Sequence, residues 1–300
     1  MELMRGNEEA LSLCIGCGNC SKVCRRTDPA HAIQDMVAIV RRLVPSKAYA
    51  DTGFAMPADP AFAEVPSPEW TGEDIFLMPG CVVRCKAPFI ENAAADALSA
   101  MGFGVSEIPV NGCCLHPTMF RATGEPGRYS ERRRMFDSAR GKPIVTLCGG
   151  CSDEFAFSGF KTPHIIRFLR ENIDLLPGTD VPLKVALEPG CAAMAHLGEM
   201  EEVVKAMGFV PIGNKPECCG KSIALAPEMM RENEERCGDA DVIVVGCPMC
   251  FVKYDQYPNG KPVMHIAELV AFAAGSRDGL RYHRIRPDIH ERSRIRFWVG

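Results

Sequence analysis

The chain has 300 residues, 47% of them hydrophobic, and a formal net charge of −4, which fits a folded protein of two or three compact units. The weak negative charge excludes a global electrostatic attraction to nucleic acid, and no apolar run reaches the length of a membrane-spanning helix. Residues 1–13 lack the apolar core of a secretory leader, so we expect a cytoplasmic protein. Because structural disulfides are rare in the cytosol, the 16 cysteines point to metal or redox chemistry.

The first four cysteines have the spacing C-x2-C-x2-C-x3-C: Cys14, Cys17, Cys20 and Cys24. This spacing is typical of a loop that holds a [4Fe–4S] cubane cluster. Arg25 stands where ferredoxins usually have proline, and no second loop of four cysteines exists. The fourth ligand is therefore open between Cys24, Cys85, Cys237 and a residue of a partner protein. A closed zinc site of four cysteines is the alternative.

Residues 28–44 are expected to form an amphipathic helix, with Asp28 as N-cap and Pro29 in the first turn. Its apolar residues recur at helical spacing: Ile33, Met36, Val37, Val40 and Leu43. The proline-rich stretch 45–73 is expected to be a linker.

The remainder of the chain contains an internal repeat. The segment IFLMPGC (75–81) matches VALEPGC (185–191), and PIVTLCGGC (143–151) matches DVIVVGCPMC (241–250). The offset shrinks from 110 between Cys81 and Cys191 to 99 between Cys148 and Cys247, as expected after a duplication with loop deletions. We therefore expect two domains of one fold, 74–180 and 181–275, followed by a basic tail over 276–300.

Each repeat is expected to alternate strands and helices. An apolar strand runs into Pro-Gly-Cys, a helix follows (88–101 in the first copy), and a short strand leads to two adjacent cysteines. A charged helix, 128–140 or 227–237, is interpreted as a solvated face; a third strand then runs directly into CxxC, and a last helix closes the repeat. This order predicts an α/β fold with a mostly parallel sheet in each repeat. Since sites gather at the carboxyl ends of parallel strands, the five cysteines of a repeat are expected to converge.

Each repeat contributes five cysteines, which are Cys81, Cys113, Cys114, Cys148 and Cys151 in the first and Cys191, Cys218, Cys219, Cys247 and Cys250 in the second. A zinc ion or a cubane cluster takes only four thiolates. Five thiolates at one site imply either a spare nucleophilic thiol or an unusual cluster with an additional ligand.

The spacings C-x31-CC-x33-CxxC and C-x26-CC-x27-CxxC resemble tandem CCG domains, as found in the B subunit of heterodisulfide reductase and in related oxidoreductase subunits. The resemblance implies two α/β domains, each with a noncubane [4Fe–4S] cluster on its five cysteines, which together cleave a disulfide. It assigns the ten repeat cysteines a cluster-based catalytic role. Residues 1–44 resemble half of the helical, ferredoxin-like C subunit. Leu115 departs from the family because glycine usually follows the cysteine pair, so zinc in place of one cluster is the alternative.

Three further histidines and two cysteines have open roles. His164 and His265 begin the last helix of each repeat, either as proton donors or, as we favour, as helix-entry residues packed for structure. His116 is interpreted as a polar loop residue rather than a ligand. Cys85 and Cys237 are expected to be small buried residues if they are not ligands of the first group.

The sequence contains no motif for ATP, NAD or flavin, so electrons must come from a partner protein of flavin or ferredoxin type. We expect an iron–sulfur oxidoreductase subunit of a hetero-oligomeric complex that reduces a disulfide. The alternative is an electron-transfer or assembly subunit of a larger anaerobic redox complex, with no substrate of its own. The basic tail is either a docking element for an acidic partner or a solvated end.

Overall fold

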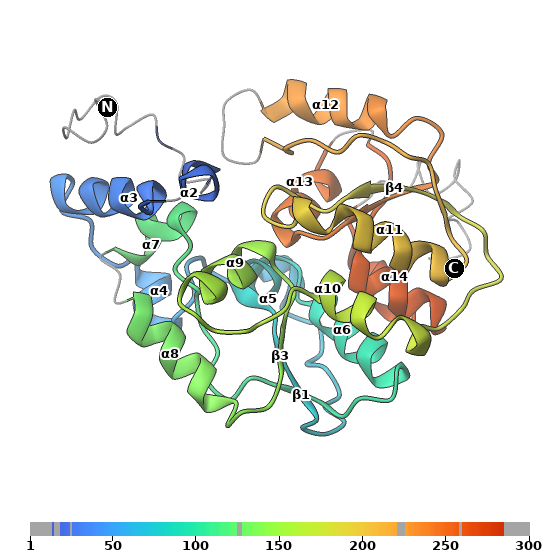
Figure 1. Ribbon diagram of the computed structural model, residues 1–300, viewed down its shortest axis with the longest axis horizontal. Helices are drawn as coiled ribbons and strands as arrows, with labels where there is room; N and C mark the ends of the chain where they lie inside the picture. The colour runs from blue at the N-terminus through green and yellow to red at the C-terminus, as the bar shows by residue number, and fades with distance from the viewer. Residues whose placement is uncertain are drawn as a thin grey trace.

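The computed structural model describes residues 14, 19–24, 26–124, 128–220, 226–257 and 260–284. They form two α/β units, each built on a parallel sheet (Figure 1). The first sheet has the order β2-β1-β3, with β1 at Ile75–Met78, β2 at Val105–Glu107 and β3 at Ile144–Thr146. The second has the order β5-β4-β6-β7, with β4 at Lys184–Glu188, β5 at Val210–Pro211, β6 at Val242–Val245 and β7 at Val263–His265. The predicted α/β class with parallel sheets is confirmed.

The two sheets also have equivalent pairings. Strands β1 and β4 are central, and each pairs in parallel with the short strand after its first helix and with the strand that precedes CxxC. An isolated parallel bridge between Thr146 and His164 occupies, in the first unit, the place that β7 takes in the second. This correspondence is what the repeated sequence leads one to expect.

The helices include the expected ones in the expected order, with four additions. In the first unit they are α5 (Gly80–Lys86), α6 (Phe89–Ala100), α7 (Phe120–Thr123), α8 (Arg128–Ser138), α9 (Gly149–Phe157) and α10 (Ile165–Glu171). In the second they are α11 (Leu197–Ala206), α12 (Ala226–Arg236), α13 (Pro248–Asp255) and α14 (Ile266–Ala273). The additions are α5, α7, α9 and α13, because the sequence analysis expected only three helices in each repeat. Cys81 therefore lies in the first turn of a helix.

The two units share a single interior. Helix α6 of the first unit packs on α14 of the second, and α10 packs on α11. The helix that precedes the second strand of each unit therefore contacts the last helix of the other unit. Buried residues of both sheets, among them Leu77 and Val185, belong to one continuous hydrophobic cluster. Burying apolar area is the main favourable term in folding, so the repeats stabilise one another as one body.

The N-terminal segment consists of α2 (Asn19–Val23), α3 (Pro29–Val40) and α4 (Lys47–Thr52), with α3 beside α7 (Figure 1). Asp28 caps α3 as predicted, accepting a hydrogen bond from the backbone N–H of His31 over 3.3 Å. The helix ends earlier than predicted, and Val40 is exposed rather than buried. The physical reason is that α3 has only a short packing surface, which Ile33 and Val37 fill.

The stretch 45–73 differs from the predicted linker. It contains α4, which Ser46 caps, and a 3-10 turn at Pro60–Phe62. Ala55 and Phe62 are buried in the shared core. Further apolar side chains pack on the same core, and the backbone N–H of Asp59 donates to the carbonyl of Cys85 over 2.7 Å, so this segment is held on the first unit although its prolines suggested an extended connection.

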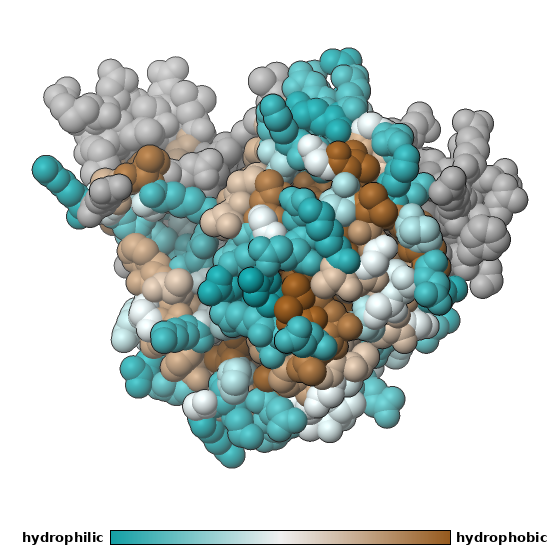
Figure 2. All heavy atoms as spheres, turned by 45° about the vertical axis from the view of Figure 1, so that its right-hand side comes forward, coloured by the Kyte–Doolittle hydropathy of each residue, from teal (hydrophilic) through white to brown (hydrophobic). Residues whose placement is uncertain are grey.

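The predicted basic tail begins by folding back on the molecule. Ser276 Oγ lies 2.5 Å from a carboxylate oxygen of Asp96, and His283 pairs with Glu268 over 2.7 Å. Residues 285–300, which hold the rest of the tail, lie outside the described residues. The face shown in Figure 2 mixes hydrophilic residues with small, separate groups of hydrophobic ones. Among the helices that the structure describes, none has the length and apolar character needed to cross a membrane.

Candidate cysteine site

The cysteines of both repeats lie at the carboxyl ends of parallel strands. Cys148 follows β3 and is the N-cap residue of α9, and Cys247 follows β6 and is the N-cap residue of α13. Both have the same extended backbone, with φ near −125° and −123°. The first cysteine of each repeat follows a glycine with positive φ, Gly80 at +77° and Gly190 at +85°. These turns direct the chain from the strand end back toward the CxxC motif.

The structure brings all five cysteines of the first repeat together. The thiol of Cys113 hydrogen-bonds with those of Cys81 and Cys114, and the thiol of Cys151 with those of Cys114 and Cys148. Four of the five are buried, and Cys148 is partly exposed. Hydrogen bonds from neighbouring thiols lower the pKa of Cys114 and raise that of Cys113, because one thiol of each pair keeps the proton.

The five cysteines of the second repeat lie together in the same way, with more exposure. Cys191 Sγ lies 3.5 Å from Cys218 Sγ, and Cys250 Sγ lies 3.4 Å from Cys219 Sγ. Cys247 hydrogen-bonds with Cys250. Cys218 is exposed, and the hydrogen bond from Cys191 lowers its pKa to about 6. Thiolates are the form that binds metal, so the second set is also chemically suited to that role.

The two sets meet across the boundary between the repeats. The thiol of Cys148 hydrogen-bonds with that of Cys247, each the first cysteine of its CxxC motif. The hydrogen bond to Cys148 is the largest cause that raises the pKa of Cys247 to about 11. The ten repeat cysteines therefore form one site, with five thiols contributed from each side.

Glycine leaves room at the centre of each set. A Cβ on Gly80 would lie 2.9 Å from Cys151 Sγ, and a Cβ on Gly190 would lie 2.5 Å from the Cβ of Cys247. The donor set consists of thiols, which are soft ligands that suit iron–sulfur clusters. Both observations fit a cluster on each set of five. Within the described residues, no three His, Cys, Asp or Glu side chains are arranged as a ready site for one metal ion.

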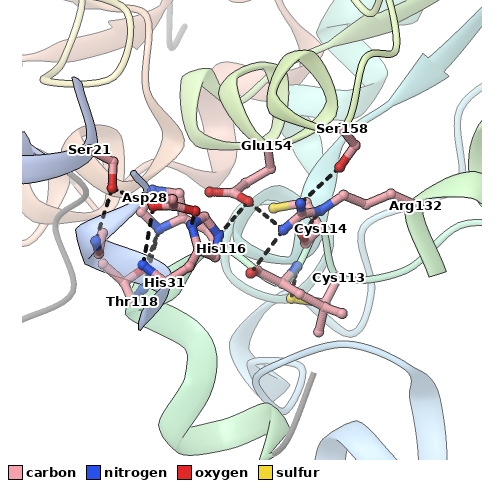
Figure 3. A network of polar contacts seen from close by, with 12 residues as sticks. Ser21, Asp28, His31, Cys113, Cys114, His116, Thr118, Arg132, Glu154 and Ser158 are labelled. Atoms are coloured by element: carbon pink, nitrogen blue, oxygen red, sulfur yellow. Dashed lines mark hydrogen bonds and ion pairs between the residues drawn. The ribbon is translucent and has the colours of Figure 1, made fainter. Parts of the chain in front are cut away.

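An arginine supports the cysteine pair of the first repeat (Figure 3). Arg132 Nε donates to the carbonyl of Cys114 over 2.8 Å, and its Nη2 donates to the carbonyl of Leu115 over 3.3 Å. Leu115 has a left-handed backbone, with φ of +56°, at the place where Gly220 has +65° in the second repeat. The guanidinium thus holds a backbone turn that costs roughly 1 kcal/mol for a residue with a side chain.

The burial of Arg132 corrects the interpretation of 128–140 as a solvated face. Its side chain is 1% exposed, whereas Arg133 and Arg134 beside it are exposed. The sequence has three consecutive arginines and no signal for which one turns inward. Packing decides it, because Arg132 reaches the carbonyls of Cys114 and Leu115, whereas Arg133 and Arg134 pair with carboxylates on the exposed side of the same helix.

A chain of polar contacts continues from Arg132 to the N-terminal segment (Figure 3). Glu154 of α9 pairs with the Arg132 guanidinium, and its Oε2 lies 2.9 Å from His31 Nε2 of α3. On its other side, His31 Nδ1 pairs with Asp28. Glu154 and His31 are both buried, and no motif in the sequence predicted either. Three segments far apart in the chain are therefore joined beside the first cysteine pair.

The helix-entry interpretation of His164 and His265 is confirmed. The Nδ1 of His164 accepts a hydrogen bond from the N–H of Ile166, and that of His265 accepts one from Ala267. Burial lowers the pKa of His164 to about 3, so its imidazole is neutral at physiological pH. His116 has its Nδ1 3.0 Å from Thr118 Oγ1, in a loop next to the CxxC segment.

The N-terminal motif is described at Cys14, Cys20 and Cys24, while Cys17 lies outside the described residues. Gln34 Nε2 donates to Cys14 Sγ over 3.2 Å, and Cys24 Sγ lies 3.4 Å from Thr27 Oγ1. The backbone N–H of Cys24 donates to the carbonyl of Cys20 over 3.1 Å, and in this described part no hydrogen bond joins the thiols of the motif to one another.

Cys85 and Cys237 are buried in the first and second units respectively. Burial raises the pKa of Cys85 to about 11 and that of Cys237 to about 12. This agrees with their interpretation as small buried residues.

One residue of the N-terminal motif contacts the repeat site directly. Lys22 Nζ donates to the carbonyl of Cys191 over 3.0 Å and pairs with Asp153 over 3.2 Å. A cavity of about 490 Å3 lies at the same place, lined by Lys22, His31, His116, Phe157 and Cys191, among others. The cavity lies between the N-terminal segment and both repeats, and it reaches the repeat cysteines at Cys191.

The geometry can be compared with known proteins. Residues 75–156 match the family model of the cysteine-rich domain named CCG. The match covers most of the first repeat. The chain is similar to the B subunit of the ferredoxin/F420H2-dependent CoB-CoM heterodisulfide reductase of Methanosarcina acetivorans, with 25% identity over 265 residues, covering 66% of this chain and 88% of the relative. The B subunit of the ferredoxin:CoB-CoM heterodisulfide reductase of Methanosarcina mazei is 26% identical with the same coverage. Both relatives are subunits of a heterodisulfide reductase, so the comparisons support the interpretation of this chain as an iron–sulfur, oxidoreductase-like subunit.

Similarity to solved structures is weak. An aspartate racemase homologue from Pyrococcus horikoshii has 12% identity and a TM-score of 0.33, with 67% of this chain and 97% of that chain covered. A likeness at this level indicates neither the fold nor the function of this chain.

Proposed function

We propose that this CCG chain is the disulfide-reducing subunit of a redox complex and receives its electrons from a partner protein. The observation that carries the proposal is the contact between Cys148 and Cys247, which joins two five-thiol sets into one site. Cleavage of a disulfide takes two electrons and yields two thiols, so a site with two equivalent halves suits it.

The ten repeat cysteines would hold two [4Fe–4S] clusters, and the N-terminal motif would hold a cubane. These clusters would supply one-electron steps. The protein residues determine where a substrate can reach the cysteines. Four of the five cysteines of the first set are buried, whereas Cys191 of the second set lines the cavity of about 490 Å3. A disulfide would therefore approach from the side of the second repeat. We divide the chain accordingly into 1–44, a connecting stretch 45–73, and domains 74–180 and 181–275.

The electron donor would dock on the N-terminal segment. Of the nine large apolar side chains that are exposed in the described part of the chain, four lie there: Val23, Ile39, Val40 and Val44. Arg41 and Arg42 beside them are exposed as well. The segment therefore fits an electron-donor protein with an apolar contact patch and an acidic rim. Lys22, which links this segment to Cys191, would place the entry point next to the repeat site.

The same exposed residues favour a second candidate, an electron-transfer or assembly subunit with no substrate of its own. The cavity beside Cys191 distinguishes the two, because a subunit that only transfers electrons has no need of it.

The test is the content of iron, acid-labile sulfide and zinc in the anaerobically purified chain, with electron paramagnetic resonance during titration with a thiol and a disulfide. Roughly 12 iron and 12 sulfide per chain, the number for three four-iron clusters, and a new signal on thiol addition are expected. About 4 iron with zinc, and no response to thiols, would overturn the proposal. Cys148→Ser should abolish the thiol response, and Cys85→Ser, a buried cysteine outside both sets, is the matched control.

A further inference from the structure

Disulfide reduction consumes protons as well as electrons. The balance is R–S–S–R′ + 2 e− + 2 H+ → RSH + R′SH: the S–S bond breaks, two S–H bonds form, and the electrons come from the one-electron donor protein. An alkyl thiolate is a poor leaving group unless it is protonated, since free thiols titrate near 8.5. The site therefore needs a proton donor at the place where the thiolate is released.

The cavity beside Cys191 has an acid–base pair in its wall. His31 and Glu154 both line it, with His31 Nε2 2.9 Å from Glu154 Oε2. The His31 ring stacks on Phe157, with ring centroids 5.4 Å apart, so its position is fixed from two sides. The pair comes from α3 and α9, and the same α9 begins at the first CxxC motif.

Carboxyl groups flank the imidazole on both sides. Glu154 lies at Nε2 of His31 and Asp28 at Nδ1, and the Arg132 guanidinium, which is permanently positive, pairs with Glu154. Asp28 is the member through which solvent is reached, since its side chain is 14% exposed and lines the cavity.

We propose that the His31–Glu154 pair donates the proton to a thiolate released in this cavity, an inference that rests on the proposed disulfide reduction. The N–H bond of the imidazole breaks, an S–H bond forms, and the ring regains a proton from solvent by way of Asp28. Arg132 is a positioning residue, because it holds Glu154 and does not line the cavity.

The other titratable groups at the cavity have different partners. Lys22 of α2 pairs with Asp153 of α9, and His116 packs on the Thr118 loop. Neither contacts Glu154 in the part of the chain that the structure describes. His31 is therefore the group whose removal tests the proposal most directly.

The experiment uses two probe disulfides on the cluster-loaded chain, reduced by titanium(III) citrate. Bis(hydroxyethyl) disulfide releases alkyl thiolates that need a proton, whereas dithiobis(nitrobenzoate) releases aromatic thiolates that leave without one. His31→Gln is expected to slow reduction of the alkyl disulfide about 100-fold, the size of a lost general acid, and to leave the aromatic disulfide within about twofold. His196→Gln is the matched control, because His196 pairs with Glu199 over 2.7 Å and does not line the cavity.

Equal slowing of both disulfides by His31→Gln, or no slowing of either, would overturn the inference and leave the proposed function in place. If the wild-type chain reduces neither disulfide, the proposed function fails and the inference fails with it. Where His31→Gln lowers the iron content, Asp28→Asn gives the second test: asparagine keeps the helix cap, and the same selective loss on the alkyl disulfide is expected.

Discussion

His164 and His265 make equivalent hydrogen bonds across the boundary between the two repeats. The Nε2 of His164 lies 2.9 Å from the carbonyl oxygen of Gly246, and the Nε2 of His265 lies 3.2 Å from that of Leu147. Each carbonyl belongs to the residue directly before a CxxC motif of the opposite repeat. Because Nδ1 of each ring accepts a backbone N–H, Nε2 carries the proton and donates it. The two histidines thereby fix the CxxC motifs relative to each other, where Cys148 meets Cys247.

This arrangement predicts a loss of stability in mild acid that depends on His164. Burial lowers its pKa to about 3, whereas the unfolded chain binds the proton below about 6.5. The unfolded state therefore holds more protons between these values, so the stabilisation is complete above pH 6.5 and falls as pH decreases. His164→Gln keeps a side-chain donor and removes the titration. The stability advantage of wild type over this variant should shrink by about 1.4 kcal/mol between pH 7.5 and pH 5.5.

The difference between the two proteins is the quantity to measure, by urea unfolding at several pH values. Burial raises the pKa of Glu91 to about 7 and that of Glu188 to about 8, which works in the opposite direction over the same range. These carboxyl groups are present in both proteins, so they cancel in the comparison. Unfolding free energies that run parallel with pH would contradict the prediction.

Substitutions of Leu115 should reverse the usual order of stability, in which an alanine variant is more stable than a glycine variant. Its φ of +56° lies in the left-handed region, where glycine is unstrained and a Cβ costs roughly 1 kcal/mol. Both Leu115→Ala and Leu115→Gly lose a buried side chain, so both should be destabilised by about 2–5 kcal/mol. Leu115→Gly is nevertheless expected to be the more stable of the two by about 1 kcal/mol. Thermal or urea unfolding decides the order, and a more stable alanine variant would show that the turn carries no strain.

The buried pair of Arg132 and Glu154 should behave as a unit. Arg132→Met leaves the Glu154 carboxylate buried without its guanidinium and should cost about 3–5 kcal/mol of unfolding free energy. Removing both charges in Arg132→Met with Glu154→Gln should cost less than the sum of the single changes, by about 1–3 kcal/mol. Arg133→Met, which breaks the exposed Arg133–Asp137 pair on the same helix, is the control and should change stability little. Additive effects of the two buried changes would indicate that the ion pair does not couple them.

The parts of this structure that sequence could predict are those set by local pattern. The repeated Pro-Gly-Cys and CxxC motifs at strand ends predicted that five cysteines would converge, because parallel strands end at one edge. The inward turn of Arg132, the packing of Phe62 from the supposed linker, and the bonds of His164 and His265 to the opposite repeat all depend on long-range packing. No periodicity in the sequence carries that information.

Gly190 gives the most direct test of the space within the second cysteine set. A Cβ there would lie 2.5 Å from the Cβ of Cys247 and 3.3 Å from Cys250 Sγ, and the φ of +85° already disfavours a side chain. Gly190→Ala is therefore expected to displace the CxxC segment and to lower the iron content by about a third, the share of one four-iron cluster in three. Gly198→Ala in α11 is the matched control, because a Cβ there meets nothing within 4 Å and alanine favours a helix. Iron and sulfide analysis of both variants under anaerobic conditions makes the comparison. Full iron content in Gly190→Ala would contradict the prediction and would mean that the second set of thiols binds its iron without this close approach.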